Sequence, residues 1–408
     1  MTIICLVIND LAQDQRMDRI CTSLVRAGHE VTLVGRLLPS SKELPDKTYR
    51  QHRIHCRYEK GKLFYAEYNY RLIRELRSWH YDAICAVDLD TLLAGVRLTT
   101  SDRHKLVFDA HEWFSETPEV VKRPLIRGIW RGLAKALVPK SDVRYTVAPM
   151  LAEKLAEEYG VPFGTVRNLP VRRVSSVGPS PSTSPVPAAA PTSETPSTPP
   201  SLQRARAQSD YSSDNIGHSP KLTAPNHTLY RLVYQGMLNP GRGLKTVLAA
   251  IAYLPECELW LIGDGPEMEA LQKCAEDFGI TNRVWFAGFR PPTDLPALTE
   301  RAWLGLNLLD AVSLSYYYSL ANKAFDYVQA GLPSVQMAFP EYCALQEEYR
   351  CYALIDRLEP ARLIAIIEHL IQTPEAYQKL VTASKRAAEE LVWENEEAKL
   401  LEIWKSLC

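Results

Sequence analysis

The sequence lacks long apolar runs, paired cysteines and an excess of either charge. No apolar segment approaches the roughly 20 residues that cross a bilayer, so we expect any membrane contact to be peripheral. With 47 basic and 48 acidic residues the net charge is −1, which argues against a whole-chain affinity for nucleic acid. The nine cysteines include no Cys-x-x-Cys pair and no companion His at zinc spacing. We therefore expect reduced thiols, a cytosolic protein and no bound metal.

Two features of the chain predict its domain organisation. Its 408 residues exceed one ordinary core, and the opening MTIICLVIND is typical of a buried first strand rather than a signal peptide. Within residues 173–226, eight of the chain's 28 prolines lie between Pro179 and Pro200, amid Ser, Thr and Ala. Such a segment buries too little apolar surface to offset its ordering entropy, so we expect a disordered tether between two globular parts.

On both sides of the tether, short β-rich runs alternate with amphipathic stretches. The runs are IICLVI, EVTLVGR, YDAICAV, KLVFDA and VRYTV before it, and YRLVYQ, ELWLIG, RVWFAG, WLGLNLL and LPSVQM after it. This alternation predicts an α/β fold of two Rossmann-like, doubly wound parallel sheets, in residues 1–172 and 227–385. Ligands bind beyond the carboxyl ends of such strands, so we expect the two halves to face each other across a cleft.

The segment GMLNPGRG follows the strand RLVYQ and precedes the helical pattern LKTVLAAIAYL. Gly236, Gly241 and Gly243 would let the backbone approach a ligand, the following helix N-terminus carries exposed N–H groups, and Arg242 adds a full charge. That combination suits a phosphate. For this segment taken alone, an ordinary strand-to-helix turn with a solvated Arg242 is an equal alternative.

Two further segments place polar or flexible residues directly after predicted strands. LIGDGPEME has Gly263 and Gly265 at the strand end, but its spacing is not that of a dinucleotide-binding GxGxxG loop. SLANKAFDYVQAGLPSV has Asn322 and Lys323 at the start of a helix and Asp326 one turn later. Lys323 can meet a phosphate, and Asp326 can accept two hydrogen bonds from a diol such as ribose. The alternative is an i, i+3 surface pair worth about 0.2–0.5 kcal/mol.

In order and spacing, GMLNPGRG, LIGDGPE, RVWFAGF and NKAFDYVQAGLPSV resemble the nucleotide-sugar half of the GT-B glycosyltransferases, closest to glycosyltransferase family 4. The resemblance implies that Arg242 grips the donor diphosphate, that Asp326 holds the ribose, and that the loop near Phe289 and Arg290 contacts the base. It also implies that residues 386–408 form a helix that crosses back to the first half. Retention of anomeric configuration without a metal is implied as well, with cations and helix dipoles stabilising the leaving nucleoside diphosphate.

This sequence departs from the family at two positions of the donor site. Met237 stands where the family often has Arg, and Tyr318 stands at the first Glu of its paired-Glu motif. Since one diphosphate calls for two cations, we hypothesise that Lys323 substitutes for the missing one, aided by the N-terminus of its helix. The predicted catalytic residues of this half are therefore Arg242 and Lys323.

In the first half, KLVFDAHEWF puts Asp109, His111 and Glu112 directly after a strand. This DAHE segment resembles one found in part of family 4, and His111 aligns with the cleft His that contacts the donor sugar. Asn9 and Asp10 follow the first strand, where the family places its acceptor-side loop. We expect Asn9, Asp10 and Glu112 on the acceptor side, although Asp10 or Asp14 can instead cap the following helix.

The stretch VKRPLIRGIWRGLAKALVPK, around residues 122–140, sets four basic residues four apart: Arg123, Arg127, Arg131 and Lys135. A basic amphipathic helix of this kind can lie on an anionic membrane surface, which would suit a lipid-linked acceptor. A solvated face above a core-facing apolar stripe is an equally good interpretation.

Together these features predict a cytosolic, metal-independent, retaining glycosyltransferase of the hexosyltransferase type. It would move a sugar from a nucleotide-sugar donor to a hydroxyl of a glycan or lipid-linked acceptor, as in surface polysaccharide assembly, at the inner face of a membrane. One alternative is a GT-B nucleotide-sugar epimerase with a different first half. Another, suggested by Met237 and Tyr318, is a degenerate partner subunit that binds nucleotide without turnover. The donor base, the sugar and the acceptor do not follow from the sequence.

Overall fold

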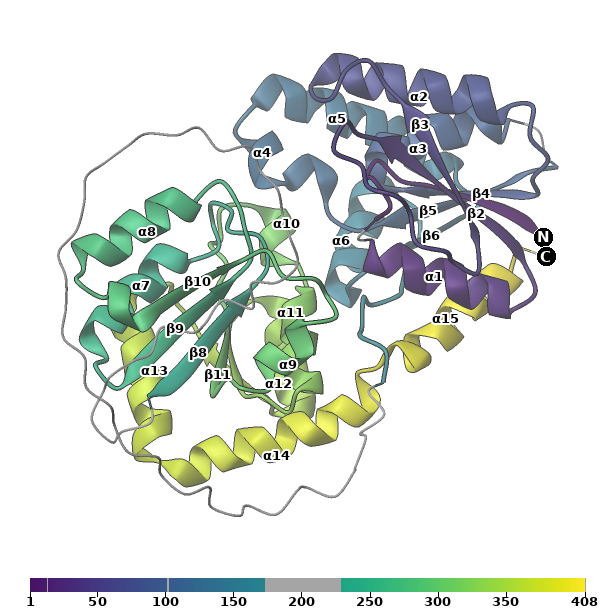
Figure 1. Cartoon of the computed structure of the whole chain (residues 1–408). Coiled ribbons are helices and arrows are strands. Elements are labelled where there is room, and N and C mark those ends of the chain that lie inside the picture. The colour runs from purple at the N-terminus through teal and green to yellow at the C-terminus, as the bar shows by residue number, and fades with distance from the viewer. Residues whose placement is uncertain (13, 101–102, 173–228, 408) are drawn as a thin grey trace, which may run out of the picture. The chain divides into compact units, whose positions relative to one another are not determined.

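The computed structural model describes residues 1–12, 14–100, 103–172 and 229–407 (Figure 1). The predicted tether, residues 173–226, lies outside the described residues. The described parts before and after it belong to one compact unit. Each part carries its own parallel sheet with helices against it.

The first sheet has seven strands in the order β3-β2-β1-β4-β5-β6-β7, all paired in parallel. Its strands are β1 (Thr2–Leu6), β2 (Glu30–Leu37), β3 (Arg50–His55), β4 (Ala83–Val87), β5 (Lys105–Ala110), β6 (Val143–Thr146) and β7 (Gly164–Thr165). The helices are α1 (Gln15–Arg26), α2 (Lys62–Leu76), α3 (Asp88–Leu98), α4 (Pro118–Val121), α5 (Pro124–Leu137) and α6 (Pro149–Tyr159). Ile3 of β1 pairs with Val31 on one side and Ala83 on the other, so the strand order reverses at β1.

The second sheet has six parallel strands in the order β10-β9-β8-β11-β12-β13. Its strands are β8 (Tyr230–Gln235), β9 (Cys257–Ile262), β10 (Val284–Gly288), β11 (Leu304–Asn307), β12 (Ser334–Met337) and β13 (Tyr352–Ile355). The helices are α7 (Leu244–Tyr253), α8 (Met268–Asp277), α9 (Leu295–Thr299), α10 (Leu314–Tyr317), α11 (Asn322–Gln329), α12 (Pro340–Tyr349), α13 (Pro360–Gln372) and α14 (Pro374–Glu390). Figure 1 shows α7 and α8 on one side of this sheet and α11 and α12 on the other.

The predicted α/β fold of two doubly wound parallel sheets is confirmed. The apolar central strands explain why both faces of each sheet are covered by helices. All residues of β4 and β9 are buried, as expected for strands covered by helices on both faces. The sequence analysis did not predict three of the strands, β3, β7 and β13. β3 and β13 are edge strands, β3 has the polar sequence RQHRIH, and β7 has only two residues.

The last helices join the second part of the chain to the first. α14 continues to Glu390, so the predicted boundary at 385/386 falls inside it, and α15 (Trp393–Lys405) follows after a break at Leu391 and Val392. The indole N–H of Trp393 donates to Ser23 Oγ of α1 at 3.0 Å, and Trp404 is buried in the same core as β1. α15 therefore packs on the first sheet's side of the molecule.

Candidate active site

The GMLNPGRG loop leaves β8 and enters α7 at the position where the second sheet reverses its strand order. Gly243 has φ +68° and caps α7, and a Cβ there would lie 2.7 Å from the Leu308 carbonyl oxygen. The Arg242 guanidinium carbon lies 4.9 Å from the centre of the Tyr316 ring. Its Nε is buried and has no hydrogen-bond acceptor within the described chain. Arg242 is therefore held by an aromatic ring and not by a carboxylate.

The LIGDGPE loop packs directly on the first loop. A Cβ on Gly263 would lie 2.0 Å from the Gly236 carbonyl oxygen, and one on Gly265 would lie 2.7 Å from the Leu238 nitrogen. The Leu238 N–H donates to the Asp264 carbonyl at 2.9 Å. The contact between the two loops is thus sufficient reason for both glycines, whichever ligand binds beside them.

Lys323 is the second residue of α11, and its side chain lies against the GMLNPGRG loop. Its side chain is 9% exposed, and Nζ lies 3.5 Å from the centre of the Tyr234 ring. A Cβ on Gly236 would lie 3.4 Å from this Nζ, which is ordinary contact, so the φ of +125° and not the space is the reason for glycine there. Burial lowers the pKa of Lys323 well below its usual value, the charge of Arg242 adds to the effect, and Asp326 opposes it. The surface pair suggested as an alternative for this segment is wrong, because Lys323 is buried.

Met237 and Tyr318, which depart from the family pattern, lie on the GMLNPGRG loop and directly after α10. Met237, the neighbour of Gly236, is 56% exposed and points no charge at the site. The ring of Tyr318 lies 6.3 Å from that of Trp113, which follows β5 in the first half of the chain. Among the described residues, the Lys323 ammonium lies against the ring of Tyr234, and Asp326 is the carboxylate whose charge acts on it.

The remaining residues predicted for the donor lie on the same edge of the second sheet. Gln235 Nε2 donates to Asp326 Oδ2 at 2.9 Å, which fixes that carboxylate. Asn322 is exposed and accepts a hydrogen bond of 2.8 Å from Asn168. Phe289 is 55% exposed at the end of β10, and the Arg290 guanidinium lies 5.8 Å from the Trp285 ring centre.

In the first half, His111 lies between two carboxylates. Its Nε2 is 3.2 Å from Asp109 Oδ2, its Nδ1 is 3.7 Å from Asp88 Oδ2, and its backbone N–H donates to Asp88 Oδ1 at 2.8 Å. Burial alone would lower the pKa of His111, but the charges of Asp109 and Asp88 raise it to about 9. His111 is therefore an imidazolium at neutral pH.

Asp109 is the centre of this network. It is fully buried and pairs with Arg16 Nη2 at 2.8 Å, while Arg16 Nη1 donates to the Val166 carbonyl at 3.0 Å. Although burial alone would raise the pKa of Asp109, the charges of Arg16 and His111 lower it to about 2. Sequence reasoning missed Arg16 and Asp88. For Asp88 a signal existed in the sequence, since it directly follows the apolar run AICAV, where ligand-binding residues of parallel sheets lie. In the structure it takes φ +55°, which few non-glycine residues adopt.

Glu112 lies where the two halves influence each other. Burial and the charges of Asp88 and Glu119 raise its pKa to about 8, and His111 and Arg242 oppose that shift. The charge of Arg242, from the second half of the chain, therefore reaches Glu112.

The predicted acceptor-side residues that follow β1 form hydrogen bonds and ion pairs with neighbouring residues of the first half. Asn9 Oδ1 accepts from the Leu11 N–H at 2.9 Å, and Asp10 Oδ1 lies 3.0 Å from Arg53 Nη2. Asp14 caps α1 by accepting from the Met17 N–H at 2.9 Å, so Asp14 and not Asp10 is the helix cap. Residues 9–12 still line a cavity of about 430 Å³.

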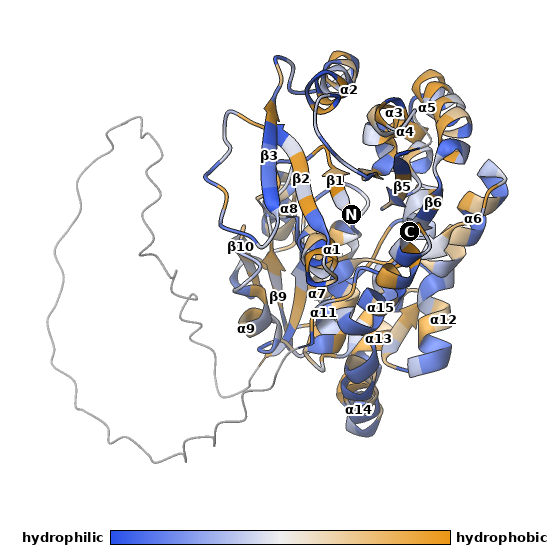
Figure 2. Cartoon of the chain, turned by 90° about the vertical axis from the view of Figure 1, so that its right-hand side faces the viewer, coloured by the Kyte–Doolittle hydropathy of each residue, from blue (hydrophilic) through white to orange (hydrophobic). Residues whose placement is uncertain are grey.

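The basic helix predicted around residues 122–140 is α5 with the residues that flank it, and its basic and apolar side chains do not divide cleanly between two faces. Arg127 binds the buried Glu116 through two nitrogens, and Arg131 pairs with Glu158 at 3.0 Å, so two of the four basic side chains are not on a free face. Leu125 is 81% exposed and Ile129 is 63% exposed, so the apolar stripe is not wholly core-facing. Figure 2 shows hydrophobic stretches along α5. None of the described helices is long and apolar enough to span a bilayer.

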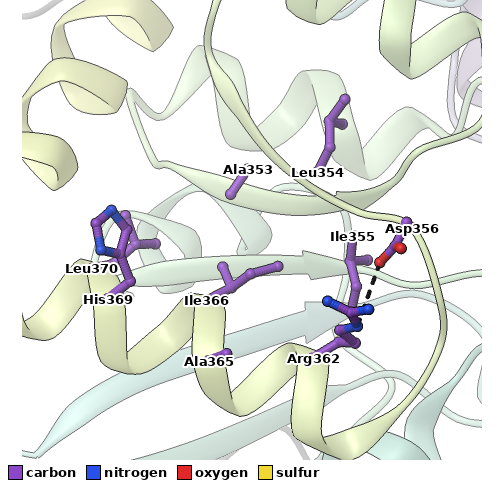
Figure 3. A pocket seen from close by; sticks show the side chains of 9 residues that line it. All are labelled: Ala353, Leu354, Ile355, Asp356, Arg362, Ala365, Ile366, His369 and Leu370. Carbon is purple, nitrogen blue, oxygen red and sulfur yellow. Dashed lines mark ion pairs between the residues drawn. The ribbon is translucent and has the colours of Figure 1, made fainter.

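A hollow elsewhere in the second half contains none of the predicted residues. It measures about 370 Å³ and lies between β13 and α13, with the Arg362–Asp356 ion pair of 3.9 Å at one end (Figure 3). Its other lining side chains are mostly apolar, and His369 is the remaining titratable group. The candidate active site is therefore made of two parts, Arg242 and Lys323 at the carboxyl edge of the second sheet and His111 at the carboxyl edge of the first.

Comparisons with known proteins bear on the fold and on the class of protein. The model "Glycosyltransferase Family 4" matches residues 14–170, and "Glycosyl transferases group 1" matches residues 219–387. The lipopolysaccharide core biosynthesis glycosyltransferase LpsE of Rhizobium meliloti is 46% identical over 52 residues, which are 13% of this chain and 15% of that protein. The match thus spans much less than two thirds of this relative's length.

Two solved structures are similar over their full length. Sucrose-phosphate synthase from Thermosynechococcus elongatus superposes with a TM-score of 0.73 at 14% identity, covering 100% of this chain and 99% of that one. Anabaena HepE in complex with UDP-glucose superposes with a TM-score of 0.69 at 16% identity, covering 100% of both chains. At such identities the likeness shows the fold, which is GT-B.

Proposed function

Because the chain carries both domains of a GT-B glycosyltransferase, we propose that it moves a sugar from a nucleotide-sugar donor to a hydroxyl group of a glycan or lipid-linked acceptor. We further propose that it retains the anomeric configuration and needs no metal. The complex of HepE with UDP-glucose makes a UDP-sugar the first donor to test. The match of the first half to a glycosyltransferase model favours this function over the epimerase alternative.

The observation that carries the proposal is a pair of cations at the carboxyl edge of the second sheet that form no ion pair within 4.0 Å with any carboxylate of the described residues. Arg242 lies against Tyr316 and Lys323 against Tyr234. An ammonium that is 9% exposed and unpaired costs free energy, and an anion beside it would remove that cost. A diphosphate is such an anion, and the N-termini of α7 and α11 begin next to the same two residues.

These groups suit the departure of a nucleoside diphosphate. Negative charge develops on the leaving phosphate as the glycosidic bond breaks, and Arg242, Lys323 and the helix termini would stabilise it. His111 is already protonated and its ring nitrogens face Asp109 and Asp88, so it serves as a fixed cation and hydrogen-bond donor rather than as a base. Asp326, fixed by Gln235, would hold the ribose.

The test compares UDP and uridine binding by the wild type and single variants, using calorimetry. We expect Arg242→Ala and Lys323→Ala each to weaken UDP about tenfold or more, with little effect on uridine, since charged hydrogen bonds contribute about 1.5–3 kcal/mol. Lys245→Ala is the matched control, because this lysine is 62% exposed in the same loop-to-helix region.

If Lys323→Ala leaves UDP affinity and turnover unchanged while Arg242→Ala abolishes them, Lys323 does not replace the missing cation. Binding without turnover on any acceptor would favour the partner-subunit alternative.

For localisation, we propose that the enzyme works in the cytoplasm and touches the inner face of a membrane through α5. The contact surface would be Leu125 and Ile129, flanked by the exposed basic residues Lys122, Arg123 and Lys135. Apolar insertion and about 1 kcal/mol per basic residue would hold it on anionic lipid. Flotation with anionic vesicles at low salt should carry the wild type and lose the double variant Leu125→Gln, Ile129→Gln. Absence of wild-type flotation would remove the membrane contact from the proposal.

A further inference from the structure

We propose that the first half binds an anionic group of the acceptor, a phosphate or a carboxylate, in a pocket formed by Arg36, His55 and Arg57. The pocket lies at the carboxyl ends of β2 and β3, the edge of a doubly wound sheet at which ligands bind. This inference rests on the proposed function, because it names the class of acceptor that the enzyme takes.

The pocket has the size and the charge for such a group. Its volume is about 250 Å³, and Arg36, His55 and Arg57 contribute to its lining together with Tyr58. Glu59 is the single carboxylate among the described residues that line it. Two guanidinium groups and an imidazole therefore face one acid, and guanidinium groups match phosphate and carboxylate with paired hydrogen bonds.

Arg36 is positioned and keeps donors to spare. Its guanidinium carbon lies 4.6 Å from the centre of the Phe64 ring, and Nη1 donates to the Glu59 carbonyl at 2.9 Å. Its Nε is buried and has no acceptor within the described chain. A buried donor without an acceptor costs free energy, so a bound anion that accepts from Arg36 would gain from an already oriented group.

Arg57 is presented by a fixed piece of backbone. The N–H groups of Arg57 and Tyr58 each donate to the Glu67 carboxylate at 3.0 Å, and that carboxylate also pairs with Arg71 at 2.7 Å. Glu67 is thus engaged by three donors away from the Arg57 side chain. The guanidinium of Arg57 is exposed, and its one described partner is the ring of Tyr58 at 5.9 Å.

A series of ring contacts leads from the pocket toward Glu112. The Arg36 guanidinium carbon lies 4.6 Å from the centre of the Phe64 ring, and that centre lies 5.5 Å from the centre of the Tyr65 ring. The Tyr65 ring centre lies 5.4 Å from that of Trp130, which lies 4.8 Å from that of Phe114, two residues after Glu112. The pocket and Glu112 thus lie at the same carboxyl edge of the first sheet, and an acceptor whose anionic group binds Arg36 would extend along that edge toward Glu112.

The experiment measures binding to protein saturated with UDP, so that the donor cations are occupied. The probes are glucose 6-phosphate, glucuronate, inorganic phosphate and glucose, each titrated by calorimetry. We expect glucose 6-phosphate or glucuronate to bind and glucose not to bind. Arg36→Gln should weaken the bound anion about tenfold and Arg57→Gln less. Arg97→Gln, an exposed arginine on α3 of the same half, should leave it unchanged.

Three results would overturn the inference while UDP binding still supports the proposed function. They are no binding of any anion, equal affinity in the wild type and in both pocket variants, or binding of inorganic phosphate alone. The last would reveal a free-phosphate site and no acceptor site. If Arg36→Gln does not fold, Arg57→Gln decides the matter, because the exposed Arg57 side chain contacts only the ring of Tyr58 among the described residues. Failure of UDP itself to bind would instead contradict the proposed function.

Discussion

The two halves of the candidate active site differ in whether their buried charges are paired within the protein. In the first half, His111, Asp109 and Arg16 compensate one another inside the protein. In the second half, Arg242 and Lys323 face aromatic rings and leave their charge to be met by something else. The charges of the first half are therefore met inside the protein before any ligand arrives, so that removing one of them would leave another buried and unpaired. In the second half the buried ammonium costs stability, and an anion that binds it would recover that cost.

Removing the centre of the first network should have the largest effect. Asp109→Ala leaves the buried Arg16 without its carboxylate, so we expect a loss of about 3–5 kcal/mol in the free energy of unfolding. Chemical denaturation measures it. The control is Glu157→Ala, which breaks an exposed pair with Lys154 and should cause no measurable loss. Equal stability of the two variants would mean that the first half does not depend on compensated charge.

The protonation of His111 should give the next largest effect. Its pKa is 6.5 before folding and about 9 in the structure, so protonation stabilises the folded state. That stability is fully present below pH 6.5 and is lost as the pH rises through about 9; the shift corresponds to at most about 3 kcal/mol. The side chain is 24% exposed, which reduces the effect. Unfolding of the wild type and of His111→Gln at pH 6 and pH 10 should show a gap between them that narrows at high pH. A gap independent of pH would contradict a cationic His111.

The same comparison shows what the sequence could and could not predict. Strand ends follow from short buried runs, so the positions of His111, Arg242 and Lys323 at sheet edges were predictable from β-rich periodicity and the glycine-rich turn. The partners were not, because Arg16 and Asp109 lie 93 residues apart and meet only in the folded protein. The closeness of Gly263 to Gly236 and the inward pairing of Arg127 likewise depend on how loops and helices pack, which a single sequence does not display.

The smallest expected effect concerns the proton on Lys323. In the free protein its pKa is lowered, mainly by burial, so its charge costs stability at low pH and the cost disappears as the pH rises toward the value of an unfolded lysine. A diphosphate beside it would raise this pKa, and UDP binding would take up a proton and weaken as the pH rises. Calorimetry in buffers of different ionisation enthalpy measures the uptake. Lys323→Met should abolish it, unfold at higher denaturant concentration and bind UDP about tenfold more weakly. Lys245→Met should change none of the three. If proton uptake persists in Lys323→Met, another group takes up the proton. UDP binding then does not relieve the free-energy cost of the buried Lys323 ammonium.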